Sequence, residues 1–385
     1  MRTGRPAFGL HSRKILRALS ISVLAAGMVA CGGGEADKDA LPSALTPSQA
    51  VQMLTSAPKS YPAAMAIKVT TQSIDLRVTG AIRRGGPSLT GSESFPVGSL
   101  TKSMTATLAG VLVQDGKVTW NTRLLTVFPE LAVTARQEYA QLELKDLLAH
   151  RGGLFPATTA DQIARLPSLS GNATEQRASL LTWMLQTPST STPRAKTQYS
   201  NGDYVAAAAI LERVTGQPYE VLLQTRVFTP MNQAVSFGIA GSVSGEPWGH
   251  AWVSGQWQAV SPNAPDAQFP AFANPAGGAK LSGQALARYL QMHLRAFRGN
   301  STEVLNSSTA RFVHTVVQDD FALGWQKGQD LADQPIHWHN GSDDVSYYAL
   351  MALSLNSDKA SAVVVTGVGS TTEADVSETT VRILR

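Results

Sequence analysis

The stretch FPVGSLTKSMTATLAGVLVQDGKV, residues 95–118, decides the expected fold and chemistry of this chain. Gly98 marks the start of a predicted helix within it, and Gly116 marks the end. Four apolar residues recur there at helical spacing: Met104, Leu108, Val111 and Leu112. This spacing predicts a helix whose apolar face packs against the rest of the protein.

Ser99 and Lys102 lie three residues apart at the start of that helix, so their side chains share one face. A serine hydroxyl is a weak nucleophile until a neighbouring base takes its proton, and a lysine amine is one such base. The backbone N–H of Ser99 is also suited to an oxyanion hole. The spacing alone is weak, because Ser56 and Lys59 repeat it where Pro58 opposes helical geometry.

Tyr199-Ser200-Asn201 comes directly before the helical pattern DYVAAAAILERVTG, residues 203–216. A lysine ammonium near Tyr199 would drive the phenol toward phenolate, which is a base. The alternative is a tyrosine that only packs beside the helix.

His339-Asn340-Gly341 precedes a predicted strand. Gly341 allows close approach to the backbone, and the N–H of Ser342 would be a second oxyanion donor. His337 would face the opposite side of an extended segment and is predicted to be structural. A metal site here lacks a third ligand nearby, so we expect neither a metal nor another cofactor.

In this order, Ser-x-x-Lys, Tyr-x-Asn and His-x-Gly resemble the motifs of the serine β-lactamase and penicillin-binding protein family. The branch is that of class C β-lactamases, DD-peptidases and related esterases. The resemblance runs from about Tyr61 to the end of the chain and includes LLAHRGGLFP, residues 147–156, in which His150 would be structural.

The resemblance implies that Ser99 is the acylated nucleophile, that Lys102 shares its proton, and that Tyr199 is general base and later acid. It also implies four residues that bind substrate or the lysine: Asn201, His339, Gly341 and Ser342. Histidine at the third motif, in place of lysine, is more similar to DD-peptidases and esterases than to class C β-lactamases. We therefore expect an esterase or amidase first, a DD-peptidase second and a β-lactamase third.

The expected fold class is α+β of the α/β sandwich type, β-lactamase/transpeptidase-like, over residues 61–385. Strands predicted from β-branched runs near both ends would form one antiparallel sheet flanked by helices. A mostly helical region, about residues 125–300, would be inserted between them, and residues 240–280 are expected to be irregular. The predicted strands and final helix are residues 63–70, 73–82, 346–355, 361–368 and 375–385.

Residues 1–30 have the basic start and short apolar run of a secretory signal peptide. The run ends in Met28-Val29-Ala30-Cys31, which resembles a bacterial lipobox and implies lipidation of Cys31. Ordinary cleavage beside an incidental cysteine is the alternative. The composition of residues 31–60 predicts a flexible tether, with a short helix at 47–55 as an alternative within it. The protein would be secreted across the inner membrane and lipid-anchored in the periplasm. The outer membrane is the expected location, because Gly32 stands where an Asp after the cysteine often signals retention at the inner membrane.

The formal charge of +4 comes from the predicted signal peptide, which carries five basic residues and no acidic one. The remainder carries one net negative charge, which gives no reason to expect a nucleic-acid partner. The expected partners are a small-molecule or peptidoglycan-peptide substrate and the membrane of the lipid anchor, with the oligomeric state left open. The competing hypothesis is a non-catalytic, lipid-anchored protein that binds the cell envelope and has kept the fold.

Overall fold

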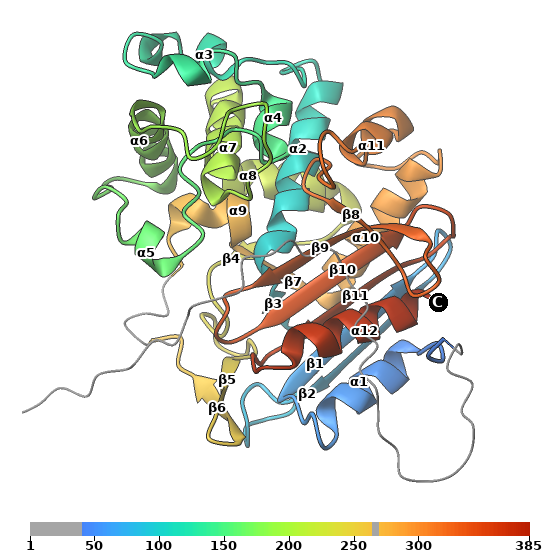
Figure 1. Cartoon of the computed structure of the whole chain (residues 1–385). Helices are drawn as coiled ribbons and strands as arrows, with labels where there is room; N and C mark the ends of the chain where they lie inside the picture. The colour runs from blue at the N-terminus through green and yellow to red at the C-terminus, as the bar shows by residue number, and fades with distance from the viewer. Residues whose placement is uncertain (1–40, 264–268) are drawn as a thin grey trace, which may run out of the picture. The chain divides into compact units, whose positions relative to one another are not determined.

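The computed structural model describes residues 41–263 and 269–385 (Figure 1). The predicted signal peptide, Cys31 and the first part of the predicted tether lie outside the described residues. Within the described ranges, no helix has both the length and the apolar character needed to cross a bilayer.

A six-stranded antiparallel sheet joins the two ends of the described chain, in the order β2-β1-β11-β10-β9-β8. The N-terminal strand β1 pairs directly with the C-terminal strand β11, for example Ala66 with Val363. The predicted sheet built from both ends is therefore confirmed. The strands are β1 Ala63–Val69, β2 Ile74–Gly80, β8 Gln326–Gln329, β9 Pro335–Ser342, β10 Tyr348–Ser354 and β11 Ala360–Val365.

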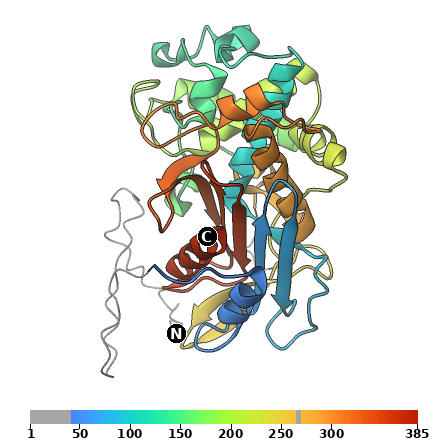
Figure 2. The same ribbon diagram turned by 90° about the vertical axis from the view of Figure 1, so that its right-hand side faces the viewer.

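Alternate residues of the sheet face two different cores, because successive side chains of a strand point to opposite faces. On β1, Ala64 and Ala66 pack with α1 (Pro47–Thr55) and α12 (Thr372–Leu384). Met65 and Ile67 face the larger core, which includes the helices of the inserted region. Figures 1 and 2 show α1 and α12 together on one side of the sheet.

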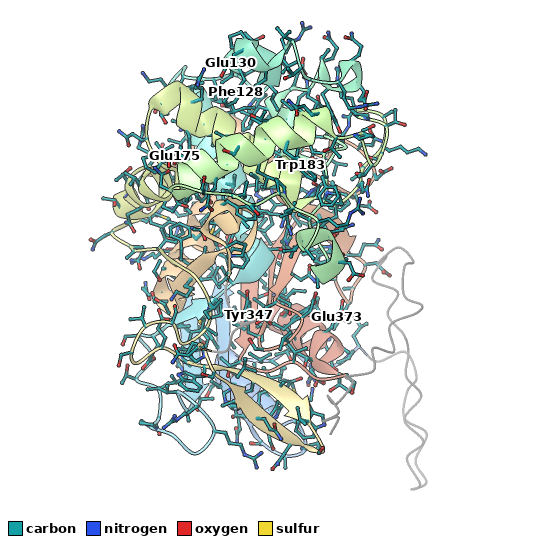
Figure 3. The ribbon with its side chains drawn as sticks, turned by 90° about the vertical axis from the view of Figure 1, so that its left-hand side faces the viewer. Phe128, Glu130, Glu175, Trp183, Tyr347 and Glu373 are labelled. Atoms are coloured by element: carbon teal, nitrogen blue, oxygen red, sulfur yellow. The ribbon has the colours of Figure 1, made fainter. Side chains whose placement is uncertain are left out.

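The inserted helices surround α2 (Thr101–Gln114), which is buried along its length from Thr101 to Leu112. In Figure 3, residues of the inserted region such as Phe128 and Trp183 lie apart from Tyr347 and Glu373 beside the sheet. The remaining helices are α3 Leu124–Val127, α4 Leu144–Leu148, α5 Ala160–Ile163, α6 Ala173–Gln186, α7 Asn201–Thr215, α8 Tyr219–Leu223, α9 Asn274–Gly277, α10 Gly283–Phe297 and α11 Ser307–Val313.

The expectation that residues 240–280 are irregular is wrong in part. They contain a hairpin of β5 (Gly249–Val253) and β6 (Gln256–Val260). Ser254 and Gly255 form its turn, both with positive φ (50° and 80°), as two-residue hairpins require. A smaller sheet, which also uses part of this region, consists of β3 Ser94–Pro96, β4 Ser236–Phe237 and β7 Ala279–Ser282.

The expected tether through residue 60 is also wrong in its second half. Residues 47–55 form the short helix α1, and the capping box of Thr46 stabilises its first turn. Ala50, Val51 and Leu54 are buried against the sheet, so this segment belongs to the folded domain. The composition is tether-like, but burial of this apolar face outweighs the loss of chain entropy.

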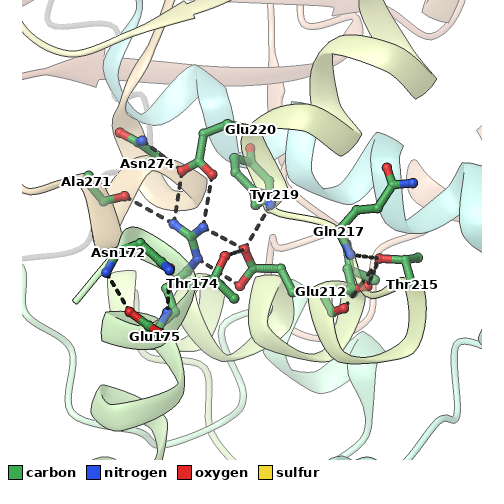
Figure 4. Close-up of polar contacts among 12 residues, drawn as sticks. Asn172, Thr174, Glu175, Glu212, Thr215, Gln217, Tyr219, Glu220, Ala271 and Asn274 are labelled. Carbon is green, nitrogen blue, oxygen red and sulfur yellow. Dashed lines mark hydrogen bonds and ion pairs between the residues drawn. The ribbon is translucent and has the colours of Figure 1, made fainter. Parts of the chain in front are cut away.

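A buried ion-pair network joins four helices of the inserted region (Figure 4). Arg177 on α6 is fully buried and donates to both carboxylate oxygens of Glu212 and of Glu220. Glu220 also accepts from Asn274 Nδ2 at 2.9 Å, which connects the network to α9. The network therefore holds α9 against α6, α7 and α8.

Arg177→Ala should lower the free energy of unfolding by about 3–5 kcal/mol, because it leaves two carboxylates facing each other without their cation. Arg213→Ala is the matched control, since Arg213 forms an exposed pair with Glu130 at 2.8 Å. The control should cost about 1 kcal/mol or less. Urea unfolding measures both, and equal losses would contradict a structural role for the buried network.

Candidate active site

Ser99 lies in a 3₁₀ turn, Gly98–Leu100, that leads from β3 directly into α2. Thr101 holds this turn in place, since its Oγ1 donates to Gly98 O at 2.6 Å and accepts from Ala279 N at 3.1 Å. The Ser99 side chain is partly exposed, while its neighbours Gly98 and Leu100 are buried. The turn thus presents one hydroxyl to the solvent side of an otherwise buried segment.

The Lys102 side chain is buried next to this hydroxyl, one helical turn along α2. Its Nζ lies 3.1 Å from Ser99 Oγ, 2.7 Å from Asn201 Oδ1 and 2.7 Å from the carbonyl oxygen of Ala276. Within the described residues, no carboxylate pairs with it. Burial without a counter-charge holds the pKa of Lys102 well below its ordinary value of 10.5.

A neutral Lys102 amine matches these three contacts. Its two N–H groups donate to the oxygens of Asn201 and Ala276, which cannot donate in return. Its lone pair is then left for the Ser99 hydroxyl. The three distances fit an ammonium as well as an amine, and the lowered pKa favours the amine, which accepts the proton of Ser99.

Tyr199 and Asn201 reach the same place from the start of α7, where Ser200 caps the helix and accepts from Asp203 N. Asn201 Nδ2 donates to Ala157 O at 2.8 Å, which turns Oδ1 toward the lysine. The Tyr199 ring lies 4.6 Å from Lys102 Nζ, measured to the ring centroid. The first two motifs therefore meet, although about a hundred residues separate them in sequence.

The ionisation of Tyr199 differs from the expectation of a phenolate. Burial raises the pKa of Tyr199 above its ordinary value of 10.0, and a hydrogen bond to Ser99 opposes this only in part. The burial that lowers the pKa of Lys102 disfavours the positive charge that would stabilise a phenolate. In the resting site, Tyr199 is therefore a neutral phenol and Lys102 is the stronger candidate base.

The His339 imidazole, on β9, lies beside Tyr199 with 6.2 Å between the ring centroids. Its Nδ1 lies 2.6 Å from Asn340 O and so carries the proton, which leaves Nε2 as a buried acceptor that no described residue contacts by a hydrogen bond. Burial lowers the pKa of His339 to about 3, so the ring is uncharged at neutral pH. His337 points the other way and contacts His314 at 2.8 Å, as the alternation of β9 predicts.

Gly98 and Gly341 bring the two backbone segments of the site into contact. A Cβ on Gly98 would lie 2.7 Å from Ser342 N, and one on Gly341 would lie 2.7 Å from Ser99 N and 2.1 Å from Val97 O. Neither position has room for a side chain. The backbone nitrogens of Ser99 and Ser342, the two predicted oxyanion donors, therefore border one narrow junction.

Lys59 and His150, which belong to segments that resemble the motifs in sequence, lie in structural positions. Lys59 pairs with Asp375 at 2.6 Å, close to the end of α1. His150 Nδ1 accepts from Ser200 N at 3.0 Å, and its ring packs on Tyr199 with 4.4 Å between centroids. His150 thus supports the tyrosine segment, which agrees with a structural role.

The carbonyl of Ala276 is a lysine partner that the sequence did not reveal, because a backbone oxygen has no residue signature. It belongs to α9, which the buried network reaches through Asn274. Thr105 Oγ1 also donates to Pro275 O at 2.7 Å and fixes α9 to α2. With Asn201 on α7 and Ala276 on α9, the inserted region therefore positions two of the three atoms that hold the lysine.

Comparison with known proteins identifies the family. The family model described as Beta-lactamase matches residues 22–384 of this chain. The chain belongs to the Beta-lactamase family. Membership of this family of serine hydrolases supports a serine hydrolase-type function. The fold expected from the three motifs is also confirmed.

Relatives of this Beta-lactamase family member carry different activities in their names. Penicillin-binding protein 4 of Amycolatopsis lactamdurans is 25% identical over 284 residues, 69% of this chain and 70% of the relative. A class C β-lactamase from Rhodobacter sphaeroides has a TM-score of 0.67 at 17% identity, covering 88% of this chain and 98% of that one. D-amino acid amidase from Ochrobactrum anthropi SV3, complexed with L-phenylalanine amide, has a TM-score of 0.66 at 20% identity, covering 88% and 97%. These two structures establish likeness of fold alone.

Metal-ligating side chains do not gather in the part of the chain that the structure describes. No group of three or more histidine, cysteine, aspartate or glutamate residues there is arranged to hold an ion. His293, His314 and His337 form a buried row, but their ring nitrogens bond to one another instead of converging on one point.

Gly98→Ala should slow the reaction of Ser99 with a fluorophosphonate probe by about 100-fold or more, because its Cβ would displace the Ser342 backbone. Gly116→Ala is the matched control, since Gly116 has a similar positive φ (66° against 53°) but open space around its Cβ. Both variants bear the strain of a left-handed alanine, about 1–2 kcal/mol. Labelling rates and thermal unfolding separate the two effects, and equal labelling of both variants would contradict the junction.

Proposed function

We propose that this protein is a serine hydrolase that acts on an ester or amide carbonyl through an acyl-enzyme. The observation that carries the proposal is the contact of the buried Lys102 amine with the partly exposed Ser99 hydroxyl at 3.1 Å. A nucleophile within hydrogen-bond reach of an unprotonated base, which is itself held by other groups, is the general arrangement of nucleophilic catalysis.

In the proposed first step, Lys102 Nζ takes the proton of Ser99 as Oγ attacks the substrate carbonyl carbon. The carbonyl oxygen becomes an oxyanion, which the N–H groups of Ser99 and Ser342 stabilise. The proton gained by Lys102 then passes, through the phenol of Tyr199, to the leaving alcohol or amine as the carbon–oxygen or carbon–nitrogen bond breaks. Water attacks the acyl-enzyme by the same route and releases the acid.

The chemistry at the third motif favours an esterase or amidase over enzymes that recognise a substrate carboxylate. His339 is uncharged at neutral pH and supplies no cation there, in contrast to a lysine at the same position. The penicillin-binding protein and class C β-lactamase among the relatives keep a DD-peptidase and a β-lactamase as the next candidates. His339 Nε2 and Asn201 would orient the substrate in each case.

Ser99→Ala should abolish labelling by a fluorophosphonate probe, and Lys102→Ala should slow it by about 10²–10⁴-fold while circular dichroism reports a folded protein. In wild type, the labelling rate should rise with pH through the Lys102 pKa and level off well below pH 10.5, because only the neutral amine accepts a proton. p-Nitrophenyl esters, nitrocefin and D-Ala-D-Ala peptides then rank the substrate classes.

Equal labelling of wild type and Ser99→Ala, or no labelling of either, would support the non-catalytic binding protein instead. If Lys102→Ala reacts as fast as wild type, the lysine is not the base. A pH profile that is still rising at pH 10.5 would contradict the neutral amine.

We also propose that the chain is exported and anchored through a lipid on Cys31. The support is the sequence of the first 31 residues, in which a basic start and an apolar run lead to the lipobox-like Met28-Val29-Ala30-Cys31. The lipid would hold the hydrolase in the periplasm at the outer membrane.

Cys31→Ala should move the protein from the membrane fraction to the soluble periplasmic fraction, because the chain then has no acyl attachment. Radiolabelled palmitate should enter wild type and not the variant. Ser43→Ala, in the first described residues, serves as a control that leaves the lipobox intact. Membrane association of Cys31→Ala equal to that of wild type would contradict the anchor.

A further inference from the structure

The loop between β9 and β10 begins at the oxyanion junction and contains two adjacent aspartates. Both carboxylate oxygens of Asp343 accept hydrogen bonds from within the loop. Oδ1 accepts from the backbone N–H groups of Val345, Ser346 and Tyr347, and Oδ2 accepts from the Ser346 hydroxyl. This carboxylate fixes the turn, whose end at Tyr347 is labelled in Figure 3.

Asp344 is held by its backbone and not by its side chain. Its N–H donates to Ser342 Oγ at 2.8 Å, and its φ of 62° is left-handed, a conformation that aspartate tolerates better than most residues. The residue is exposed, and its carboxylate has no hydrogen-bond or ion-pair partner among residues 41–263 and 269–385. A charged group next to the site is therefore available to a ligand.

The position of Asp344 relative to the site follows from two connections. Ser342, which accepts from its N–H, also supplies the backbone nitrogen that borders Gly98. Its carboxylate also acts electrostatically on the Tyr199 phenol, whose pKa it helps to raise. Asp344 therefore follows the oxyanion junction closely in the chain, and its carboxylate is within electrostatic range of Tyr199.

The other titratable groups around Tyr199 leave this negative charge uncompensated. Burial lowers the pKa of Lys102, of His150 and of His339, which disfavours a positive charge on each of them. An approaching carboxylate would meet a like charge, whereas an approaching ammonium would meet an opposite one.

We infer that Asp344 determines substrate specificity by pairing with a substrate ammonium, and that the substrates are amides or esters of amino acids with a free α-amino group. This inference rests on the proposed acyl-enzyme function and names its substrate class. In such a substrate the ammonium lies one carbon from the scissile carbonyl, and we infer that it pairs with Asp344 when the carbonyl oxygen is at the oxyanion junction. A β-lactam or a D-Ala-D-Ala peptide instead brings a carboxylate.

The test compares amino acid p-nitroanilides with their N-acetyl analogues, in both the D and L series. We expect wild type to show a higher kcat/KM for the free-ammonium member of at least one pair. Asp344→Asn should lower that ratio by roughly three- to tenfold, because it removes the charge and keeps the shape and the left-handed backbone. The wild-type ratio should also fall as salt is added, since the carboxylate is exposed.

Asp333→Asn is the matched control. Asp333 is also exposed with a left-handed φ of 56°, but it lies in the turn before β9, at the opposite end of that strand from Ser342. This variant should keep the wild-type ratio. A general effect of removing an acidic surface residue would change both variants equally.

The inference is overturned if wild type prefers or equals the N-acetyl member in every pair, if it cleaves neither member, or if Asp344→Asn keeps the wild-type ratio. Labelling of Ser99 by the fluorophosphonate distinguishes this failure from failure of the proposed function. A protein that is labelled at Ser99 but lacks the preference is still a serine hydrolase, with a different substrate class.

Discussion

The site depends on a buried lysine amine that pairs with no carboxylate in residues 41–263 and 269–385. Lys102 Nζ contacts Ser99 from its own helix, Asn201 from α7 and the Ala276 carbonyl from α9. Burial makes the ammonium form costly, and the oxygens of Asn201 and Ala276 hold the lysine Nζ in one orientation. The inserted helices are therefore needed for more than a core, because they supply two of the three contacts.

The position of that amine depends on packing some distance away. The fully buried Arg177 binds Glu212 and Glu220, and Glu220 holds Asn274 at the start of α9. Such a network is costly to desolvate and strongly coupled once formed. It connects the stability of the inserted region to the geometry of the Ala276 carbonyl.

The other half of the site depends on the sheet. Pairing of β9 with β10 carries His339, Gly341 and Ser342 as one unit, and the Gly98–Gly341 contact brings this unit against the Ser99 turn. Because β9 alternates, His339 faces the site while His337 joins a buried row of histidines. The same strand continues into the loop that exposes Asp344, so one edge of the sheet presents both the proposed oxyanion donor and the proposed specificity group.

Local sequence patterns were enough to identify the three motifs and part of the fold. Helical patterns and β-branched runs predicted α2, the final helix and the strands β1, β2, β10 and β11, but not β8 or β9. Local patterns did not indicate that α1 packs on the sheet, or that Val253-Ser254-Gly255-Gln256 turns a hairpin. The lowered pKa of Lys102, the raised pKa of Tyr199, the Ala276 contact and the exposed position of Asp344 became apparent from the tertiary structure alone. Those properties depend on burial and on atoms far apart in sequence, and a pattern of residue types along the chain contains neither.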